Sequence, residues 1–394
     1  MTTTSFRLRR IAWPAFGPSF LFGVGEGAIL PIVPLSARDL GASVSLAAFT
    51  VTLIGLGSLA SNLPASAITE RLGERRAMVA ASLWAALAML LCALARDLLV
   101  FGAGIVMIGM SAAVFNLARL SWIAETVPVQ HRARALSTLG GVLRIGLFVG
   151  PFASAAAIGA FGLDGAYAVG VAALLGGAVV ARSVAELPSH ASRHASGAPL
   201  RLRQVMREHR RVFATVGLGV VLIAAVRASR QAIVPLWADH IGLGAASASL
   251  IYGLSSAVDM LVFYPAGRGM DLHGRRAVAV PAMTIMGVAL LAVPFTQSAA
   301  TLLAAALLLG FGNGIGSGIV MTLGVDHAPS PGRTQFLGVW RLLSDAGATA
   351  GPALLAAVVA AAPLGTAIGT IGFVAFVGAG VFARWAPRTP PRRS

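Results

Sequence analysis

Apolar stretches of about 20 residues recur along the whole chain, and this recurrence constrains the fold more than any other feature of the sequence. An α-helix of about 20 residues crosses the ~30 Å hydrocarbon core of a bilayer, where lipid offers the backbone no hydrogen-bonding partner. Charged residues make up only 11% of the chain and the mean hydropathy is +0.82, whereas soluble domains carry about 25% charged residues. The sequence therefore predicts an all-α membrane protein with few residues left for a soluble domain.

Twelve of these stretches are long enough to span a membrane, six on each side of a polar, basic segment. The predicted spans are residues 11–36, 45–67, 77–95, 98–124, 135–161, 165–181, 212–238, 245–266, 277–295, 299–323, 334–361 and 364–383. The polar segment, residues 182–211, predicts a central cytoplasmic loop. Two six-helix domains, residues 1–181 and 212–394, are expected on either side of that loop.

Basic residues are distributed unevenly along this topology. All 30 are arginines, and they give the chain a formal net charge of +16. With the N-terminus inside, 23 of them lie in predicted cytoplasmic segments and two, Arg38 and Arg96, in external loops. Short cytoplasmic loops are enriched in basic residues, so the pattern predicts a multi-pass protein of the inner (plasma) membrane with both termini in the cytoplasm. Because the charge follows the topology, no nucleic-acid partner is expected.

Residues that would support catalysis or metal binding are sparse. Cys92 is the single cysteine, which excludes an intramolecular disulfide and a multi-cysteine metal site. The seven histidines lie in loops or at helix ends and form no helix-borne pair. The chain also lacks a glycine-rich phosphate-binding loop. We therefore expect no enzyme activity, no metal and no cofactor.

The two halves of the chain match each other without a gap at a constant offset of 201 residues. The matching positions are Arg9-Arg10 with Arg210-Arg211, Val33-Pro34-Leu35 with Val234-Pro235-Leu236, Gly41 with Gly242, Gly73 with Gly274, Arg75 with Arg276, Pro128 with Pro329, and Arg132 with Arg333. Since each half has six spans, equivalent helices have the same orientation. Parallel repeats of this kind are related by an axis along the membrane normal, which predicts two bundles with pseudo-two-fold symmetry.

A glycine-containing, charged motif follows the second predicted helix of each half. Residues 267–276 read GRGMDLHGRR, and a looser copy at residues 66–76 reads SAITERLGERR. The pattern resembles the cytoplasmic-loop motif of the major facilitator superfamily, from which Ser66 and Glu74 depart in the first copy. Glycine permits a tight turn and a close approach of helices, while the carboxylate can pair with an arginine or a helix N-terminus. Such a loop suits a gate.

Two acidic residues, Glu125 and Asp326, lie at the cytoplasmic ends of the fourth helices and correspond at the same offset. Each is placed to pair with Arg75 or Arg276, which would form ionic latches that hold the cytoplasmic side shut in one state. Loop charge that only satisfies the topology is the alternative. The predicted gate residues are Glu70, Arg71, Gly73, Arg75, Glu125, Gly267, Asp271, Gly274, Arg275, Arg276 and Asp326.

A second duplicated motif lies in the fifth helix of each half. Its residues are Gly146, Gly150 and Pro151, which match Gly347, Gly351 and Pro352. Small residues four apart let helices pack closely, and proline bends the helix. The first copy resembles the helix-5 motif of the superfamily's antiporters, and a generic packing seam is the alternative. The arginine that drug antiporters carry in helix 4 has no clear match, because Ile105 occupies about that place and Arg119 is too close to the cytoplasm.

The resemblance covers essentially the whole chain and implies the fold of this superfamily, with twelve transmembrane helices in two bundles. It implies a secondary transporter that works by alternating access, and the helix-5 motif favours proton-coupled efflux of a small drug-like or metabolite molecule. Proton-coupled uptake of an organic anion or a sugar is the alternative. The expected partners are the small-molecule substrate, protons and the lipid bilayer, and a monomer is expected.

Seven ionisable residues lie at or not far from mid-bilayer depth in the predicted spans, where charge is costly and marks functional sites. They are Glu26, Arg144, Arg227, Arg230, Asp259, Arg341 and Asp345. The 201-residue offset relates Glu26 to Arg227 and Arg144 to Asp345, so the halves are expected to present opposite charges across a central cavity. Glu26 is the preferred proton site, since flanking glycines would leave room for water or substrate. Ion pairing that only orients helices is the alternative.

Polar and aromatic residues within the spans are candidates for substrate contact. They are Asn62, Asn116, Gln231, Trp237, Tyr252, Tyr264 and Asn313. Such side chains suit hydrogen bonding or stacking with a ligand, but each fits interhelical packing equally well. In the central set four arginines face three carboxylates, which favours an anionic or zwitterionic substrate.

Overall fold

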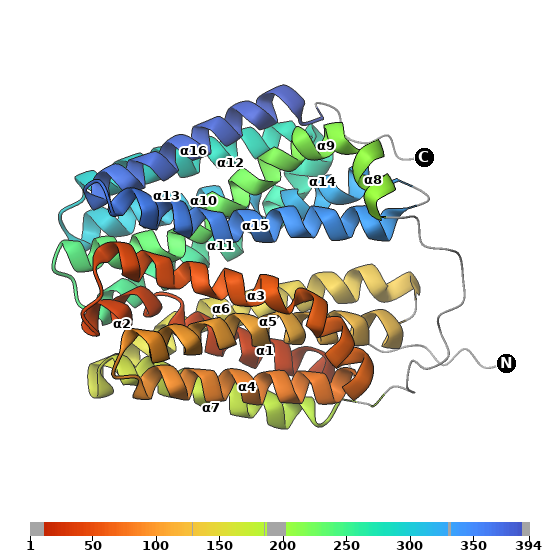
Figure 1. Ribbon diagram of the computed structural model, residues 1–394. Coiled ribbons are helices and arrows are strands. Elements are labelled where there is room, and N and C mark those ends of the chain that lie inside the picture. Colours follow the sequence, from red (N-terminus) through yellow and green to blue (C-terminus); the bar gives the residue numbers. More distant parts are fainter. Residues whose placement is uncertain (1–11, 128, 185, 187–201, 330–331, 388–394) are drawn as a thin grey trace. The chain divides into compact units, whose positions relative to one another are not determined.

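The computed structural model describes residues 12–127, 129–184, 186, 202–329 and 332–387 (Figure 1). These residues form helices joined by short turns, and no strand occurs among them. In this part of the chain, 12 helical segments have the length and apolar character needed to cross a membrane. The predicted all-α membrane fold with twelve spans is therefore confirmed.

Contacts divide the chain into two compact units. The first comprises Met1–Leu30 and Leu56–Ala195, and the second comprises Pro31–Gly55 and Ser196–Ser394. The helices of the first half of the chain are α1 (Ala12–Ile29), α2 (Val33–Asp39), α3 (Val44–Leu72), α4 (Glu74–Leu94), α5 (Leu98–Thr126), α6 (Val129–Phe161) and α7 (Leu163–Ala181). Helix α3 runs from the second unit into the first.

The second half of the chain continues with short and long helices in the second unit. They are α8 (Leu202–Glu208), α9 (Arg210–Ala214), α10 (Val216–His240), α11 (Ala245–His273), α12 (Arg276–Ala292), the 3₁₀ turn η2 (Val293–Phe295), α13 (Ala299–Gly316), α14 (Ile319–His327), α15 (Arg333–Val359) and α16 (Leu364–Trp385). Helices α8 and α9 begin within the segment that was predicted to be a central loop.

The first predicted span is broken where the sequence suggested one continuous helix. Helix α1 ends at Ile29 and α2 starts at Val33. Pro31 lies in the break and Pro34 in the first turn of α2, which has a proline at its start. A proline has no N–H to donate within a helix, but in the first turn that donor has no intrahelical partner anyway. The prolines therefore end one helix and start the next.

Helices also extend beyond the predicted spans at their predicted cytoplasmic ends. Helix α3 reaches Leu72 and α11 reaches His273, several residues past the ends of the apolar runs. Hydropathy marks only the part of a helix that lies in hydrocarbon, whereas charged turns can continue it into the headgroup region. Loop motifs that seemed to lie between helices are thus largely helical.

Helix packing repeats between the two units. In the first unit α1 packs against α6 and α7, and α4 packs against α5 and α7. In the second unit α10 packs against α15 and α16, and α12 against α13 and α16 (Figure 1). Each of these four pairings in one unit has its equivalent in the other at the 201-residue offset, so the internal repeat of the sequence is a repeat of structure.

Turn glycines repeat in the same way. Gly73 has φ 78° and Gly274 has φ 86°, and each separates the second span of its half from the third. Glycine adopts this left-handed region without strain because it has no Cβ. The loop motif therefore needs glycine at this position in both copies.

Glycines of the fifth-helix motif lie where two helices touch backbone to backbone. A Cβ added to Gly150 would lie 2.5 Å from the Val24 oxygen and 2.5 Å from the Ala28 nitrogen of α1. A Cβ on Gly351 would meet the backbone oxygen of Ala225 on α10, the residue equivalent to Val24. Close helix packing thus accounts for both copies of the motif.

Candidate functional site

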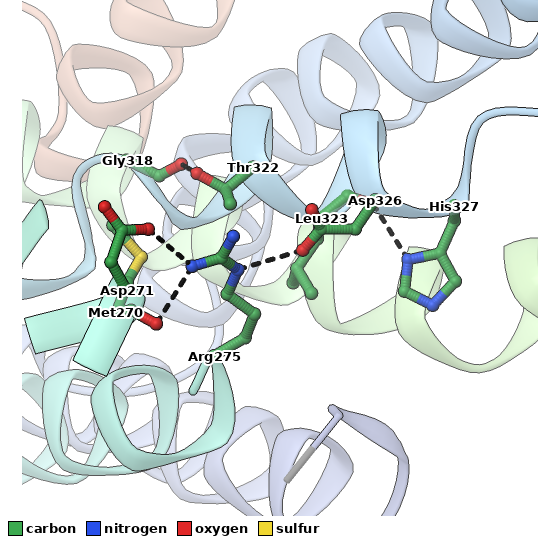
Figure 2. Close-up of polar contacts among 8 residues, drawn as sticks. All are labelled: Met270, Asp271, Arg275, Gly318, Thr322, Leu323, Asp326 and His327. Carbon is green, nitrogen blue, oxygen red and sulfur yellow. Dashed lines mark hydrogen bonds and ion pairs between the residues drawn. The ribbon is translucent and has the colours of Figure 1, made fainter. Parts of the chain in front are cut away.

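The loop motif of the second unit forms an ion cluster around Arg275 (Figure 2). Arg275 Nε donates to Asp326 Oδ2 at 2.9 Å, and Nη1 donates to Asp271 Oδ1 at 3.1 Å and to the Met270 carbonyl oxygen at 2.9 Å. The arginine is only 5% exposed. Its partners therefore compensate a charge that is largely removed from solvent, and they tie the end of α11 to α14.

Partners also fix the charge state of Arg275. Burial disfavours the guanidinium charge and by itself would lower the pKa of Arg275. The hydrogen bonds and negative charges of Asp326 and Asp271 outweigh burial and raise that pKa above its ordinary value. Arg275 therefore stays charged at any pH near neutrality, and the cluster is permanently cationic at its centre.

A break in the fourth span of the second unit brings Asp326 to this cluster. The break separates α13 from α14, and Thr322 Oγ1 donates to the Gly318 oxygen at 2.9 Å just after it (Figure 2). Trp340 Nε1 donates to the Val320 oxygen at 2.8 Å, which fastens α14 to α15. Asp326 thus lies on a short helix, α14, whose position is fixed by its hydrogen bond to Trp340.

The arginine that pairs with Asp326 differs from the predicted one. The sequence assigned this carboxylate to Arg75 or Arg276, whereas the structure pairs it with Arg275. Arg276 instead donates its backbone N–H to the Pro387 oxygen at 3.2 Å. Adjacent helical residues point about 100° apart, so the choice between them depends on where α12 begins. The predicted span began at residue 277, whereas α12 begins at Arg276.

In the first unit the arginines of the motif have a different partner. Arg75 Nη2 lies 2.8 Å from Glu186 Oε2, and Arg76 Nε lies 3.2 Å from Glu186 Oε1. Glu186 was not among the predicted gate residues. The 201-residue offset relates it to Pro387, whose oxygen accepts from Arg276. The same position thus meets the motif in both copies, but this correspondence depends on the contact of Arg276 with Pro387 and is not visible in the sequence alone.

The central charge of the motif is inverted in the first unit. Glu74 occupies the place of Arg275 and is 3% exposed. Glu70 and Arg71 are exposed, and Glu125 is half-buried. The two copies therefore share backbone geometry but not the same ion cluster.

Replacing Arg275 with alanine is expected to destabilise the second unit. Asp326 would keep a partly buried carboxylate without its main donor, and a buried polar group left unsatisfied typically costs about 1–3 kcal/mol. Thermal unfolding of the purified protein measures the effect. The matched control is Arg276→Ala, which keeps the backbone bond to Pro387 and should change stability by less than about 0.5 kcal/mol. Equal effects of the two variants would contradict the assignment of Arg275.

Within the membrane-spanning part of the second unit, one amide connects a cation to an anion. Arg227 Nε donates to Asn313 Oδ1 at 2.6 Å, and its Nη2 donates to the Asn313 carbonyl oxygen at 3.2 Å. Asn313 Nδ2 in turn donates to Asp259 Oδ2 at 2.6 Å. The chain joins α10, α13 and α11. Sequence reasoning named the three residues separately but did not connect them.

Arg230, about one turn further along α10, is buried with no acidic partner among the described residues. It is 6% exposed. Its Nη2 donates to Ser256 Oγ at 3.3 Å, and its guanidinium carbon lies 5.1 Å from the centre of the Tyr252 ring. Nη1 is buried and finds no acceptor in the described part of the chain. The aromatic ring offsets part of the cost of this charge, and donor capacity remains for an anionic group.

The other predicted charges of the spans lie on α6 and α15. Arg341 Nε lies 3.8 Å from Asp345 Oδ2, one turn along α15, and these side chains are 48% and 28% exposed. Exposed pairs at this spacing contribute little to stability. Arg144 is half-buried on α6.

In the first unit the half-buried Glu26 of α1 interacts electrostatically with Arg119 of α5, which is 9% exposed. The rings of Phe22 and Phe115 stack at 4.0 Å and hold the two helices together. From the sequence, Arg119 was too close to the cytoplasm to match the helix-4 arginine of drug antiporters, and it was not paired with Glu26. An arginine side chain is long enough to reach a carboxylate that lies at another depth.

The glycines beside Glu26 serve helix packing, which differs from their predicted role. A Cβ on Gly25 would lie 3.0 Å from Leu174 on α7, and a Cβ on Gly27 would lie 2.7 Å from the Leu147 oxygen on α6. Neighbouring helices, and not water or substrate, fill the space at these glycines.

Two of the candidate substrate contacts have other surroundings. Trp237 Nε1 donates to Thr296 Oγ1 at 2.8 Å and so links α10 to the end of the third span. Tyr264 is 69% exposed on α11, with Arg268 over its ring at 5.5 Å. Three further candidates for substrate contact are half-buried, namely Asn62, Asn116 and Gln231. Among the described residues, no group of three His, Cys, Asp or Glu side chains is placed to hold a metal ion.

A family model of the Major Facilitator Superfamily matches the chain over residues 16–259 and 216–394. Together these matches cover both halves of the internal repeat. No curated protein matches the chain in sequence. The family match agrees with the twelve spans and with the duplicated loop motif.

Solved structures share the fold at low sequence identity. The chain is similar to a D-xylose-proton symporter, with 15% identity, a TM-score of 0.75, and coverage of 97% of this chain and 98% of that one. It is similar to the nucleoside transporter NupG (11%, 0.75, 94% and 98%) and to a POT family transporter in complex with a thioalcohol conjugated peptide (13%, 0.75, 95% and 95%). At such identity the likeness establishes the fold alone. The chain belongs to the Major Facilitator Superfamily and is a multi-pass membrane transporter.

Proposed function

We propose that this transporter couples the movement of protons to the export of a small organic molecule by alternating access. The observation that carries the proposal is the set of ionisable side chains inside membrane-spanning helices, with Glu26 in the first unit and Arg227, Arg230 and Asp259 in the second. Charge at this depth is costly and is retained mainly where it serves ions or substrates. Glu26 and Asp259 supply groups that can bind a proton, and Arg230 supplies a group that can bind an anion.

Ion clusters at the loop motifs support a protein with two states. In the cluster around Arg275 the side chains of Arg275 and Asp326 are 6% and 19% exposed, although that of Asp271 is 67% exposed. In the other cluster the side chains of Arg75, Arg76 and Glu186 are 33%, 66% and 44% exposed. Pairs that form in one conformation and break in another provide the bistable element that alternating access requires. The exposed cluster exchanges its partners more readily, because water compensates its charges.

Arg230 supports a substrate that carries a carboxylate. A guanidinium offers parallel donors that match the two oxygens of a carboxylate. The contacts of Arg230 are the neutral Ser256 and Tyr252, so no carboxylate of the described residues pairs with its positive charge. A single positive charge matches a monoanion better than a dianionic phosphate.

The direction of transport rests on the helix-5 motif. Its resemblance to the motif of antiporters favours export. Helix packing accounts for the glycines in both halves, so uptake of an organic anion is the competing function. A flux measurement with gradients of either sign separates the two.

Purified protein in liposomes tests the proposal with a panel of monocarboxylic acids and their methyl esters. We expect acids, and not esters, to move against the direction of an imposed proton gradient. Arg230→Gln should lower this flux by about tenfold or more, since a hydrogen bond to a charged group contributes about 1.5–3 kcal/mol. Arg268→Gln is the matched control, because Arg268 also lies over a tyrosine ring but in an exposed pair.

Other outcomes would decide against parts of this proposal. Movement of acids together with protons would establish uptake. A substrate flux that does not change with the pH gradient would exclude proton coupling. Equal flux of acids and esters, unchanged by Arg230→Gln, would exclude the carboxylate.

A further inference from the structure

Helices α4 and α7 of the first unit lie side by side (Figure 1). Their side chains line a groove of about 650 Å³. Three arginines, Arg75, Arg76 and Arg182, line it. They come from the first turn of α4 and from the residue that follows α7. All three therefore lie at the same end of the two helices, which is the predicted cytoplasmic end.

The rest of the groove is apolar and open. Leu83, Leu175 and Val179 line it and are 46%, 45% and 67% exposed. On α4 the exposed apolar surface continues at Leu87, which is 53% exposed, one turn further into the span. Large exposed apolar side chains in a membrane-spanning helix face hydrocarbon, because exposing them to water is unfavourable. The groove thus has a cationic end and a hydrocarbon-facing side.

The groove contains more arginine side chains than carboxylates that pair with them. Glu186 pairs with Arg75 and Arg76. Arg182 is exposed and has no acidic partner among the described residues. The groove therefore has three guanidinium groups, and among the described residues a single carboxylate, that of Glu186, pairs with two of them.

The second unit contains the equivalent groove without most of this charge. A cavity of about 400 Å³ lies between α12 and α16 and is lined by Arg276, Ala277 and Ala383 among others. At the 201-residue offset Ala277 replaces Arg76 and Ala383 replaces Arg182. The fold accordingly accepts alanine at both positions. Membrane topology explains why basic residues lie at this end of both units, but it does not explain why they line the groove of the first unit.

We propose that the groove of the first unit binds one anionic phospholipid, with its phosphate at the arginines and an acyl chain along Leu83 and Val179. A bilayer supplies this combination of an anionic phosphate and a hydrocarbon chain wherever the groove faces it. Arginine forms parallel hydrogen bonds with phosphate oxygens. Basic pockets between membrane helices on the cytoplasmic side are suited to anionic headgroups.

Native mass spectrometry of the delipidated full chain tests this site. Phosphatidylglycerol and phosphatidylcholine with identical acyl chains are added at equal concentration. We expect one phosphatidylglycerol to be retained in preference to phosphatidylcholine. The double variant Arg76→Ala and Arg182→Ala, which copies the second unit, should lower this preference by about tenfold or more. The control Arg276→Ala removes the arginine of the equivalent groove and should leave the preference unchanged.

A variant of opposite sign makes the test independent of any folding defect in the double variant. Glu186→Gln removes the compensating carboxylate and is expected to strengthen retention of phosphatidylglycerol. Equal retention of the two lipids by the unaltered chain would overturn the proposal. An unchanged preference in the double variant, or an equal loss in Arg276→Ala, would do the same. Displacement of the lipid by an equal concentration of inorganic phosphate would show a phosphate site without a lipid chain, and that also contradicts the proposal.

Discussion

Replacing Glu26 with glutamine is expected to abolish proton-driven transport and to leave exchange of substrate across the membrane intact. Glutamine keeps the size and the hydrogen-bonding capacity of the side chain but cannot take up and release a proton. Glu26 lies within a membrane span and interacts with Arg119 through charge. Coupling between two sites typically amounts to about 1–3 kcal/mol, or about 5- to 150-fold in affinity. Accumulation driven by a pH gradient should therefore fall towards the level without a gradient.

Liposome flux of the same substrate, with and without a pH gradient, measures this change. Asp259→Asn is the comparison variant, because it alters another carboxylate within a span that the structure connects to a cation, through Asn313. Asp259 accepts a hydrogen bond from Asn313, which itself accepts from Arg227, so it belongs to a chain that joins three helices. We expect Asp259→Asn to lower protein stability more than it lowers coupling. Full coupling in Glu26→Gln, together with lost coupling in Asp259→Asn, would move the proton site to Asp259.

Hydropathy and the internal repeat were sufficient to predict the twelve spans, because both depend on properties that a bilayer imposes on any chain. The breaks after Ile29 and Gly316 were not predicted. The first has a local cause in Pro31 and Pro34. The second falls in a glycine-rich stretch, with glycine at positions 312, 314, 316 and 318, where helix propensity is low, and α14 is held in addition by Trp340 of another helix. Tertiary contacts of this kind are not encoded in periodicity.

Site residues were predicted by type more successfully than by partner. The loop motif identified Asp271 and Asp326 as acidic residues near an arginine, but the partner is Arg275 and not Arg276. Similarly, the charge near Glu26 comes from Arg119, which was not paired with Glu26 from the sequence. A guanidinium lies several ångströms from its own Cα, so depth along a helix does not determine which carboxylate it meets. Choosing partners requires the rotation and the spacing of helices, which the sequence leaves open.

Glycines of the fifth-helix motif illustrate where the repeat does determine packing. Gly146 would place a Cβ against the backbone oxygen of Phe20, and Gly347 would place one against that of Val221, the equivalent residue. Backbone atoms cannot move aside as a flexible side chain can. The seam between α1 and α6, and the seam between α10 and α15, therefore tolerate only glycine at these positions.

A leucine at Gly150 is accordingly expected to prevent α1 from packing against α6 and to remove most of the folded protein. Overpacking a well-packed interior typically costs about 1–3 kcal/mol, and this side chain would also meet backbone atoms of Val24 and Ala28 at 2.5 Å from its first carbon. Size-exclusion chromatography of the detergent-solubilised protein measures the folded fraction. Gly159→Leu is the matched control, since Gly159 lies on the same helix and, apart from its chain neighbours and the nearby backbone of that helix, no atom lies within 4 Å of its Cβ position. It should leave the folded fraction nearly unchanged, because its side chain extends into open space. If both variants accumulate as folded protein, the seam is not as rigid as the backbone contacts require. If both are lost, a leucine at either place disturbs insertion itself, and the difference between a packed and an open glycine has no consequence for folding.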